Sequence, residues 1–291
     1  MRKNPVLQIV SGVLSFLMMI CISLLVISIS LEATIFNTNF IIKRMDNKYY
    51  DSVISSLTRT LKDELAPPSG MPEEVFEGLF NRYLIKEDAQ ASVRAVFANI
   101  DYTYDSSRIH NILMTRFTKY VQENNIEISG TNIDTLTDYC LKEYERQISI
   151  PYMKTFAPLR QLFENAFPYA LLGISLLLIL LTLFLFRIHR FIHRALRYSI
   201  YSLFASALMV VPFPLFFLIQ GSYKKVNIMP EHVKMLFVSL FQAALFTMLI
   251  SGLIIGILGF ALLPQVKNLR IKAIKGECGA DFVPLFHRKN G

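Results

Sequence analysis

The chain has 291 residues, of which 53% are hydrophobic and only 18% are charged. Soluble globular domains carry about 25% charged residues, and the mean hydropathy of +0.41 is too high for one large or two small domains of that kind. The composition therefore excludes an ordinary soluble protein and indicates that much of the surface faces lipid.

The formal net charge of +8 is divided unevenly along the chain. Residues 32–165 contain 15 Lys or Arg and 19 Asp or Glu, whereas the remainder contains 15 Lys or Arg but only Glu231, Glu277 and Asp281. The positive excess belongs to the apolar part of the chain, so we predict no nucleic-acid partner. Cysteines occur singly in three different segments, and we expect no intramolecular disulfide.

Four apolar runs are long enough to cross the hydrocarbon core of a bilayer, which takes about 20 helical residues. They are residues 5–31, 167–186, 198–219 and 235–263. The first run is uncharged for 27 residues, which favours an uncleaved anchor because a signal peptide has an apolar core of about 7 to 15 residues. None of the runs contains a charged side chain, so proton or ion coupling through buried carboxylates is not expected. The sequence predicts an all-α membrane protein with four transmembrane helices.

The distribution of basic residues predicts the orientation. Twelve Lys or Arg lie in residues 1–4, in the turn at 187–197 and in the tail at 264–291, and four spans place these three segments on one side. By the positive-inside rule that side is the cytoplasm. We therefore expect both termini in the cytoplasm, with residues 32–166 and a short loop at 220–234 outside the plasma membrane. The lack of Asn-X-Ser/Thr sequons is compatible with a bacterial membrane.

Residues 32–166 are expected to form an extracytoplasmic helical domain. Between residues 40 and 65 apolar side chains recur about every four residues, which marks one helical face, and this helix is expected to continue out of the first span. Further helices are predicted from Pro72, at 88–98, from 105 or 106, and from Thr131 to the residues before Pro151. The predicted buried faces consist of Met45, Tyr49, Val53, Leu57, Leu61 and Leu65, then Val75, Phe76, Leu79, Phe80 and Tyr83, then Ile109, Ile112, Leu113, Phe117 and Tyr120.

Small and polar residues within the spans are predicted to mediate helix packing. Gly252 and Gly256 form a GxxxG pair, with Gly259 one turn further, and this spacing lets helix backbones approach closely. The neighbour is either another span of this chain or a partner protein. Gln242 and serines such as Ser11, Ser15 and Ser206 are expected to hydrogen-bond to neighbouring helices.

Basic residues beside the spans are predicted to contact lipid headgroups of an anionic inner leaflet. These residues are Arg187, Arg190, Arg194 and Arg197 in the turn and Lys267, Arg270, Lys272 and Lys275 in the tail. His189 and His193 would share a helical face, as some metal ligands do, but no carboxylate or cysteine lies near them in the sequence. We therefore expect headgroup contact for both histidines as well.

No motif for catalysis, a cofactor or a metal is found in the sequence. The leading hypothesis is a non-enzymatic accessory subunit or scaffold whose external domain binds a partner or ligand, or which forms a homo-oligomer. One alternative is a sensor that passes an external signal through the first span. Another is a lipid-handling enzyme or transporter with Glu32, Glu164 and Asn165 at the outer membrane interface.

Overall fold

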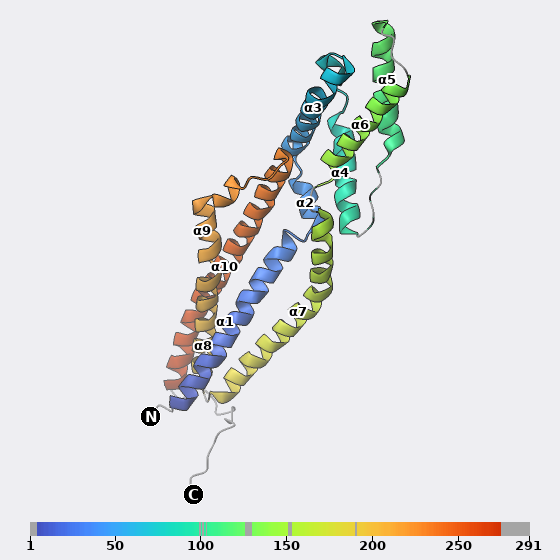
Figure 1. Cartoon of the computed structure of the whole chain (residues 1–291). Helices are drawn as coiled ribbons and strands as arrows, with labels where there is room; N and C mark the ends of the chain where they lie inside the picture. Colours follow the sequence, from blue (N-terminus) through green and yellow to red (C-terminus); the bar gives the residue numbers. More distant parts are fainter. Residues whose placement is uncertain are drawn as a thin grey trace. The chain divides into compact units, whose positions relative to one another are not determined.

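The computed structural model describes residues 5–98, 100, 102, 104–125, 130–150, 153–189 and 191–274, and within them the fold is all-α (Figure 1). The α-helices are α1 (Pro5–Ala33), α2 (Thr38–Arg44), α3 (Asn47–Ser69), α4 (Arg82–Phe97), α5 (Ser106–Glu123), α6 (Gly130–Ile148), α7 (Met153–Ile188), α8 (Ile192–Val210), α9 (Pro212–Gln220) and α10 (Glu231–Ile274). Two short 3-10 helices are η1 (Glu73–Phe76) and η2 (Ser222–Lys225).

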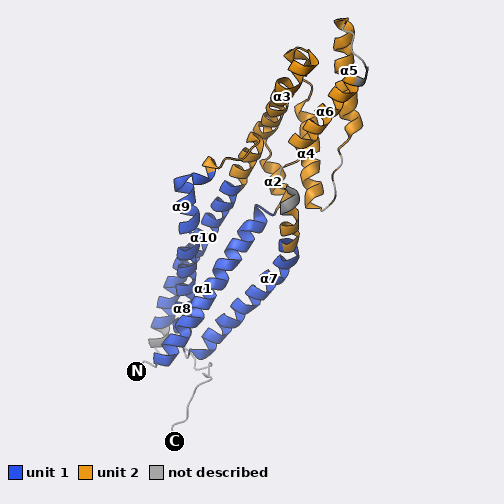
Figure 2. Cartoon of the chain, in the orientation of Figure 1, with its two compact units in different colours: residues 1–36, 163–223, 241–291 blue, residues 37–162, 224–240 orange. Residues whose placement is uncertain are grey.

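The chain divides into two compact units (Figure 2). The first, here called the membrane unit, comprises residues 1–36, 163–223 and 241–291. The second, here called the helical unit, comprises residues 37–162 and 224–240. Both α7 and α10 contribute residues to each unit.

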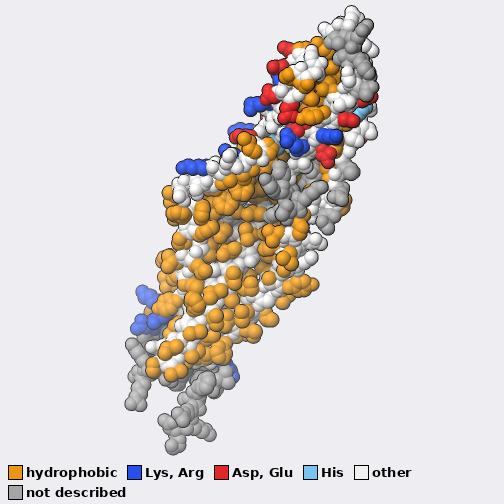
Figure 3. All heavy atoms as spheres, in the orientation of Figure 1, with side chains coloured by type: hydrophobic (Ala, Val, Ile, Leu, Met, Phe, Trp, Pro, Cys, Tyr) orange, Lys and Arg blue, Asp and Glu red, His pale blue; other side chains and the backbone are white. Residues whose placement is uncertain are grey.

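Among the described residues, four helical segments are long and apolar enough to cross a membrane: residues 5–33, 157–188, 192–220 and 231–271. Hydrophobic side chains cover most of the visible surface of α1 and α7–α10, with Lys and Arg gathered toward the ends of these helices (Figure 3). The prediction of an all-α fold with four apolar helices and a helical region between the first and second is confirmed. The chain is a multi-pass helical membrane protein.

The helix that was expected to continue out of the first span is interrupted. Helix α1 ends at Ala33, and a turn at 34–37 precedes α2. Asn37 caps α2 by accepting from the Phe40 amide, and Asp46 caps α3 by accepting from the Tyr49 amide, both at 3.0 Å. Because a capping side chain satisfies amides that lack an intrahelical partner, each cap favours a new helix start at that residue. The prediction of one continuous helix here is wrong.

The core of the helical unit is centred on α3. All six residues of the predicted face between Met45 and Leu65 are buried, which confirms that face. They pack with buried side chains of α4, α5 and α6, among them Ile85, Phe117 and Tyr144. On α5 the residues Ile109, Leu113 and Phe117 are buried, whereas Ile112 is 37% exposed.

The helix predicted from Pro72 is only the single turn η1. Gly78 follows with φ of +67°, a left-handed conformation that ends a helix and that glycine adopts without steric cost. Helix α4 then begins at Arg82, where Asn81 accepts from the Leu84 amide at 3.0 Å. Tyr83 consequently lies on α4 and is 68% exposed, so its predicted burial is wrong.

In the membrane unit, α1 and α8 pack together through serine hydroxyls. Ser15 Oγ donates to the Tyr198 carbonyl at 2.9 Å, and Ser206 Oγ donates to the Met19 carbonyl at 3.0 Å. The expected hydrogen bonding of these serines between helices is confirmed. In the N-terminal half of α1, Leu14 and Met18 pack with Leu185, Ile188 and Ala195.

Replacing Ile109 with alanine should destabilise the helical unit by about 2–5 kcal/mol, because the side chain is only 1% exposed and truncation leaves a cavity. Ile112→Ala, one turn further on α5, is the matched control and should cost less than about 1 kcal/mol because Ile112 is 37% exposed.

The measurement is maleimide labelling of Cys140 in full-length protein lacking the other two cysteines, at increasing urea. Cys140 is fully buried, and burial raises the pKa of its thiol to about 12, so it reacts when the unit opens. Labelling should begin at lower urea in Ile109→Ala. Equal urea midpoints for both variants would refute the assigned core.

Candidate functional site

A hollow in the described part of the helical unit lies between the C-terminal end of α3 and the first turns of α6. Its volume is about 420 Å³, within the range of about 300–1,000 Å³ that is usual for ligand pockets. It is lined by Leu65, Pro68, Ser69, Met71, Asn132, Ile133, Thr135, Leu136 and Tyr139. We call it the α3–α6 hollow.

The α3–α6 hollow has an apolar floor and a polar rim. Leu65, Met71 and Leu136 belong to the buried core, so the floor is continuous with the packed interior. Ser69 Oγ donates to the Leu65 carbonyl at 2.6 Å and accepts from the Met71 amide at 3.3 Å, which holds the chain after α3 in place.

The rim of the α3–α6 hollow carries an acceptor for positive charge. Tyr139 donates its hydroxyl to the Glu64 carboxylate, and this hydrogen bond, together with burial, raises the pKa of the phenol. Glu64 is therefore held close to the rim by Tyr139. The rim suits a neutral or positively charged polar group whose apolar part reaches the floor.

A second hollow, of about 500 Å³, lies where α5 meets the turn after η1. It is lined by Gly78, Leu79, Asn111, Ile112, Thr115, Arg116 and Lys119. It is more open to solvent, and its charged lining residues, Arg116 and Lys119, are basic.

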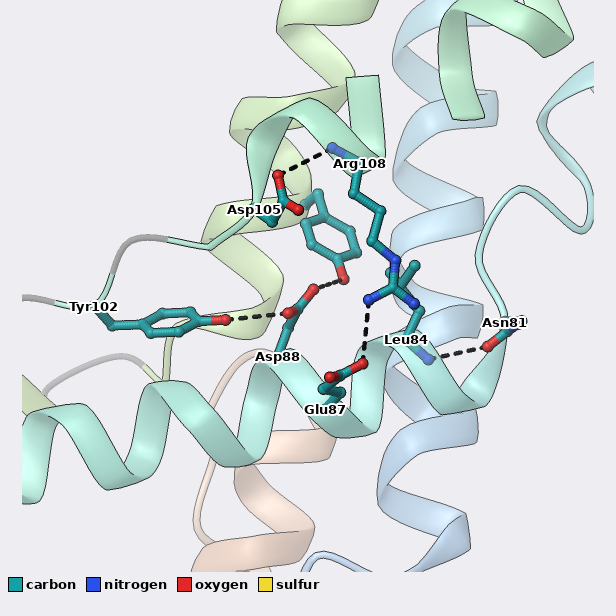
Figure 4. Close-up of polar contacts among 8 residues, drawn as sticks. Asn81, Leu84, Glu87, Asp88, Tyr102, Asp105 and Arg108 are labelled. Carbon is teal, nitrogen blue, oxygen red and sulfur yellow. Dashed lines mark hydrogen bonds and ion pairs between the residues drawn. The ribbon is translucent and has the colours of Figure 1, made fainter. Parts of the chain in front are cut away.

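Asp88 on α4 joins three segments of the helical unit (Figure 4). Tyr102 Oη donates to Asp88 Oδ1 at 3.1 Å, and Tyr144 Oη donates to Asp88 Oδ2 at 2.6 Å. Burial, reinforced by these contacts with Asp88, raises the pKa of both phenols. Both phenols donate to Asp88, so this carboxyl group ties Tyr102 and Tyr144 to α4. Arg108 on α5 adds an ion pair with Glu87 at 3.1 Å.

Three buried polar side chains lie where α3, α6 and the start of α10 meet within the helical unit. The ring of His232 packs edge-on against Tyr49 with centroids 5.5 Å apart, and the backbone of Gln147 faces the same histidine. Within the described structure neither His232 ring nitrogen has a hydrogen-bond partner, nor do Tyr49 Oη and Gln147 Oε1. Sequence analysis missed this cluster, because its members are far apart in the chain.

The three glycines of α10 lie against α8 and the residue that follows it. An added Cβ would lie 2.8 Å from Val211 Cγ2 at Gly252, 3.6 Å from Ala207 Cβ at Gly256 and 3.1 Å from Phe204 Cε1 at Gly259. Gln242, on the same helix, is half-buried.

The basic residues predicted to contact lipid headgroups occur at the ends of α7, α8 and α10. Exposed side chains among them are those of Arg187, Arg194, Arg197, Lys267 and Arg270. Arg190 and Lys275 lie outside the described residues, and for Lys272 only the helical backbone is described.

His189 does not lie on an exposed basic surface, which corrects the expectation of headgroup contact for this residue. It is 6% exposed, its Nε2 lies 2.9 Å from Ser11 Oγ, and its ring stacks on Tyr198. Burial, with the charge of Arg194, lowers the pKa of His189 and favours the neutral ring. Ser11 Oγ donates to the Leu7 carbonyl at 2.7 Å, so its proton is directed at the carbonyl and not at the ring. Activation of a serine nucleophile would require that proton to point at the ring instead.

No known family model, curated protein or solved structure matched this chain in the three comparisons made with its sequence and fold.

Gly252→Ala should destabilise the membrane unit by about 1–3 kcal/mol, because the new methyl group meets a β-branched side chain at 2.8 Å that cannot rotate away. The measurement is the SDS fraction at which helicity is lost in detergent-solubilised protein. Gly173→Ala on α7 is the control, since nothing lies within 4 Å of its added Cβ. Equal midpoints for the two variants would rule out close packing at Gly252.

Tyr144→Phe should lower the stability of the helical unit by about 1.5–3 kcal/mol, the usual cost of losing a hydrogen bond to a charged group. The exposed Tyr83→Phe is the control and should change stability by less than about 0.5 kcal/mol. Urea-dependent labelling of Cys140 again reports the opening of the unit. A midpoint in Tyr144→Phe that equals the control would contradict the anchoring role of Asp88.

Proposed function

We propose that the chain is a non-enzymatic membrane protein, an accessory subunit or scaffold, whose helical unit binds a partner outside the cytoplasm. The observation that carries the proposal is the α3–α6 hollow, an open apolar recess on a unit with its own packed core. The orientation rests on the positive-inside rule, with the basic segments in the cytoplasm.

The chemistry of the α3–α6 hollow indicates what kind of partner fits. Its apolar floor would take one or two aliphatic or aromatic side chains, and the hydroxyl, amide and Glu64 groups at its rim would take backbone or basic groups. An amphipathic protein segment with a basic residue beside its apolar face meets both requirements. A small apolar molecule would fill the floor but make no contact with the polar rim.

A sensor is the second candidate, and the continuity of α10 favours it. Residues 231–240 of this helix belong to the helical unit, where Leu236 is part of the core, and the same helix continues without interruption to Ile274. A change in the helical unit could therefore be carried along α10. The route first considered, through the first span, is interrupted at residues 34–37.

The test is photocrosslinking in cells of the native host, with a photoreactive phenylalanine at position 139 of the full-length chain. We expect a crosslinked protein from this position, because Tyr139 lines the hollow. The same substitution at the exposed Tyr83, which does not line the hollow, is the matched control and should give at least about tenfold less product.

A Leu136→Arg variant with the crosslinker at position 139 should give no crosslinked protein, because the arginine side chain would occupy the apolar floor of the α3–α6 hollow. Folding of this variant is verified by protection of Cys140 from maleimide. Equal product from positions 139 and 83, or none from 139, would refute binding at the hollow.

A further inference from the structure

Helices α8 and α10 run antiparallel with a regular register in the membrane unit. The three contacts between them pair Gly252 with Val211, Gly256 with Ala207 and Gly259 with Phe204. Each step of four or three residues along α10 is matched by an equal step back along α8, since both helices rise by the same length per residue. Phe204 and Phe260 also pack together, with ring centroids 4.8 Å apart.

Continued toward the far end of both helices, the same register would place Val266 opposite Arg197 and Arg270 opposite His193, with Lys267 beside them on α10. Both helices are uninterrupted over this length, since α8 begins at Ile192 and α10 continues through Pro264 to Ile274. The electrostatic effect of Arg270 on His193 agrees with this register, and Arg194 and Arg197 of α8 itself act on the same histidine.

At this end of the contact between α8 and α10, basic side chains of the two helices therefore lie close together. Residues 165–230 contain no Asp or Glu, and neither do residues 232–276. At this end, therefore, neither α8 nor α10 supplies a carboxylate. Cations that face one another repel, and the repulsion is relieved when an anion lies between them.

We propose that His193 and Arg197 of α8, with Lys267 and Arg270 of α10, form a binding site for the phosphate of an anionic lipid headgroup. Arginine guanidinium groups bind phosphate oxygens through paired hydrogen bonds. The first amides of α8 add donors and the positive end of its helix dipole, and Phe191 at its N-cap provides no side-chain acceptor for them within the described structure.

The apolar surroundings favour a lipid over free phosphate as the source of that group. Ile192, Leu263 and Ile271 expose their side chains beside the basic cluster, so acyl chains can lie along the helices that hold the headgroup. The site lies in the membrane unit and does not depend on what the helical unit binds.

The absence of tryptophan from the chain permits a direct test. In the full-length protein, Ile271→Trp places a single fluorophore beside the site, and Ile219→Trp on α9 serves as the control position. Quenching is measured in vesicles of phosphatidylcholine that contain either brominated phosphatidylglycerol or brominated phosphatidylcholine. We expect Trp at position 271 to select the anionic lipid by about tenfold or more, and Trp at position 219 to show no selection.

The double variant Arg197→Gln/Arg270→Gln should abolish this selection, because it removes one cation from each helix. The control variant Lys224→Gln/Lys225→Gln also removes two positive charges, but away from the proposed site, and it should leave the selection for the anionic lipid unchanged. Quenching at position 219 verifies that each variant inserts. Equal quenching by the two lipids at 271, or selection that survives the double variant, would overturn the proposal.

Inorganic phosphate distinguishes the two sources of the ligand. It should displace brominated phosphatidylglycerol from position 271 only at concentrations in the millimolar range, because it lacks acyl chains. If inorganic phosphate binds to the same basic cluster while the two lipids quench equally, the site takes free phosphate and the assignment to lipid is wrong.

Discussion

Hydrocarbon offers no hydrogen-bond partner to a peptide group, and the rest of the structure depends on this constraint. A chain with four long apolar runs can satisfy its backbone in lipid only as helices. Burying a charge in the same medium is costly, so the basic residues collect at helix ends while the apolar stretches remain uncharged. Charged residues are thereby confined to the helical unit and to the segments beside the four apolar runs.

Within lipid the helices associate without help from the hydrophobic effect, because lipid tails are as apolar as leucine side chains. Two different solutions occur on the two sides of α8. Toward α1, serine hydroxyls bond to carbonyls of the neighbouring helix. Toward α10, glycines permit close contact with valine, alanine and phenylalanine. Helix α8 takes part in both the contact with α1 and the contact with α10, so the packing of the membrane unit depends on it.

The sequence predicted the features that repeat along a helix. The four apolar helices and the buried face of α3 follow from composition and spacing alone, since each residue in such a pattern reports on the same environment. Helix boundaries between Gly78 and Arg82 were harder, because a glycine in a left-handed conformation and one asparagine cap decide them.

The candidate sites were largely invisible in the sequence. The α3–α6 hollow and the cluster of Tyr49, Gln147 and His232 require segments far apart in the chain to meet. No local pattern encodes that meeting. His189 was misjudged for the same reason, since its neighbour Ser11 lies 178 residues away.

That separation has a consequence for how the protein assembles in the cell. Ser11 enters the membrane with the first helix, yet its partner is made 178 residues later, which takes roughly 10 to 35 s at ordinary rates of translation. During this interval the hydroxyl proton is held by the Leu7 carbonyl of its own turn. The Ser11 hydroxyl therefore has a hydrogen-bond partner while the first span lies in lipid without His189. The contact with His189 forms once the turn after α7 has been synthesised.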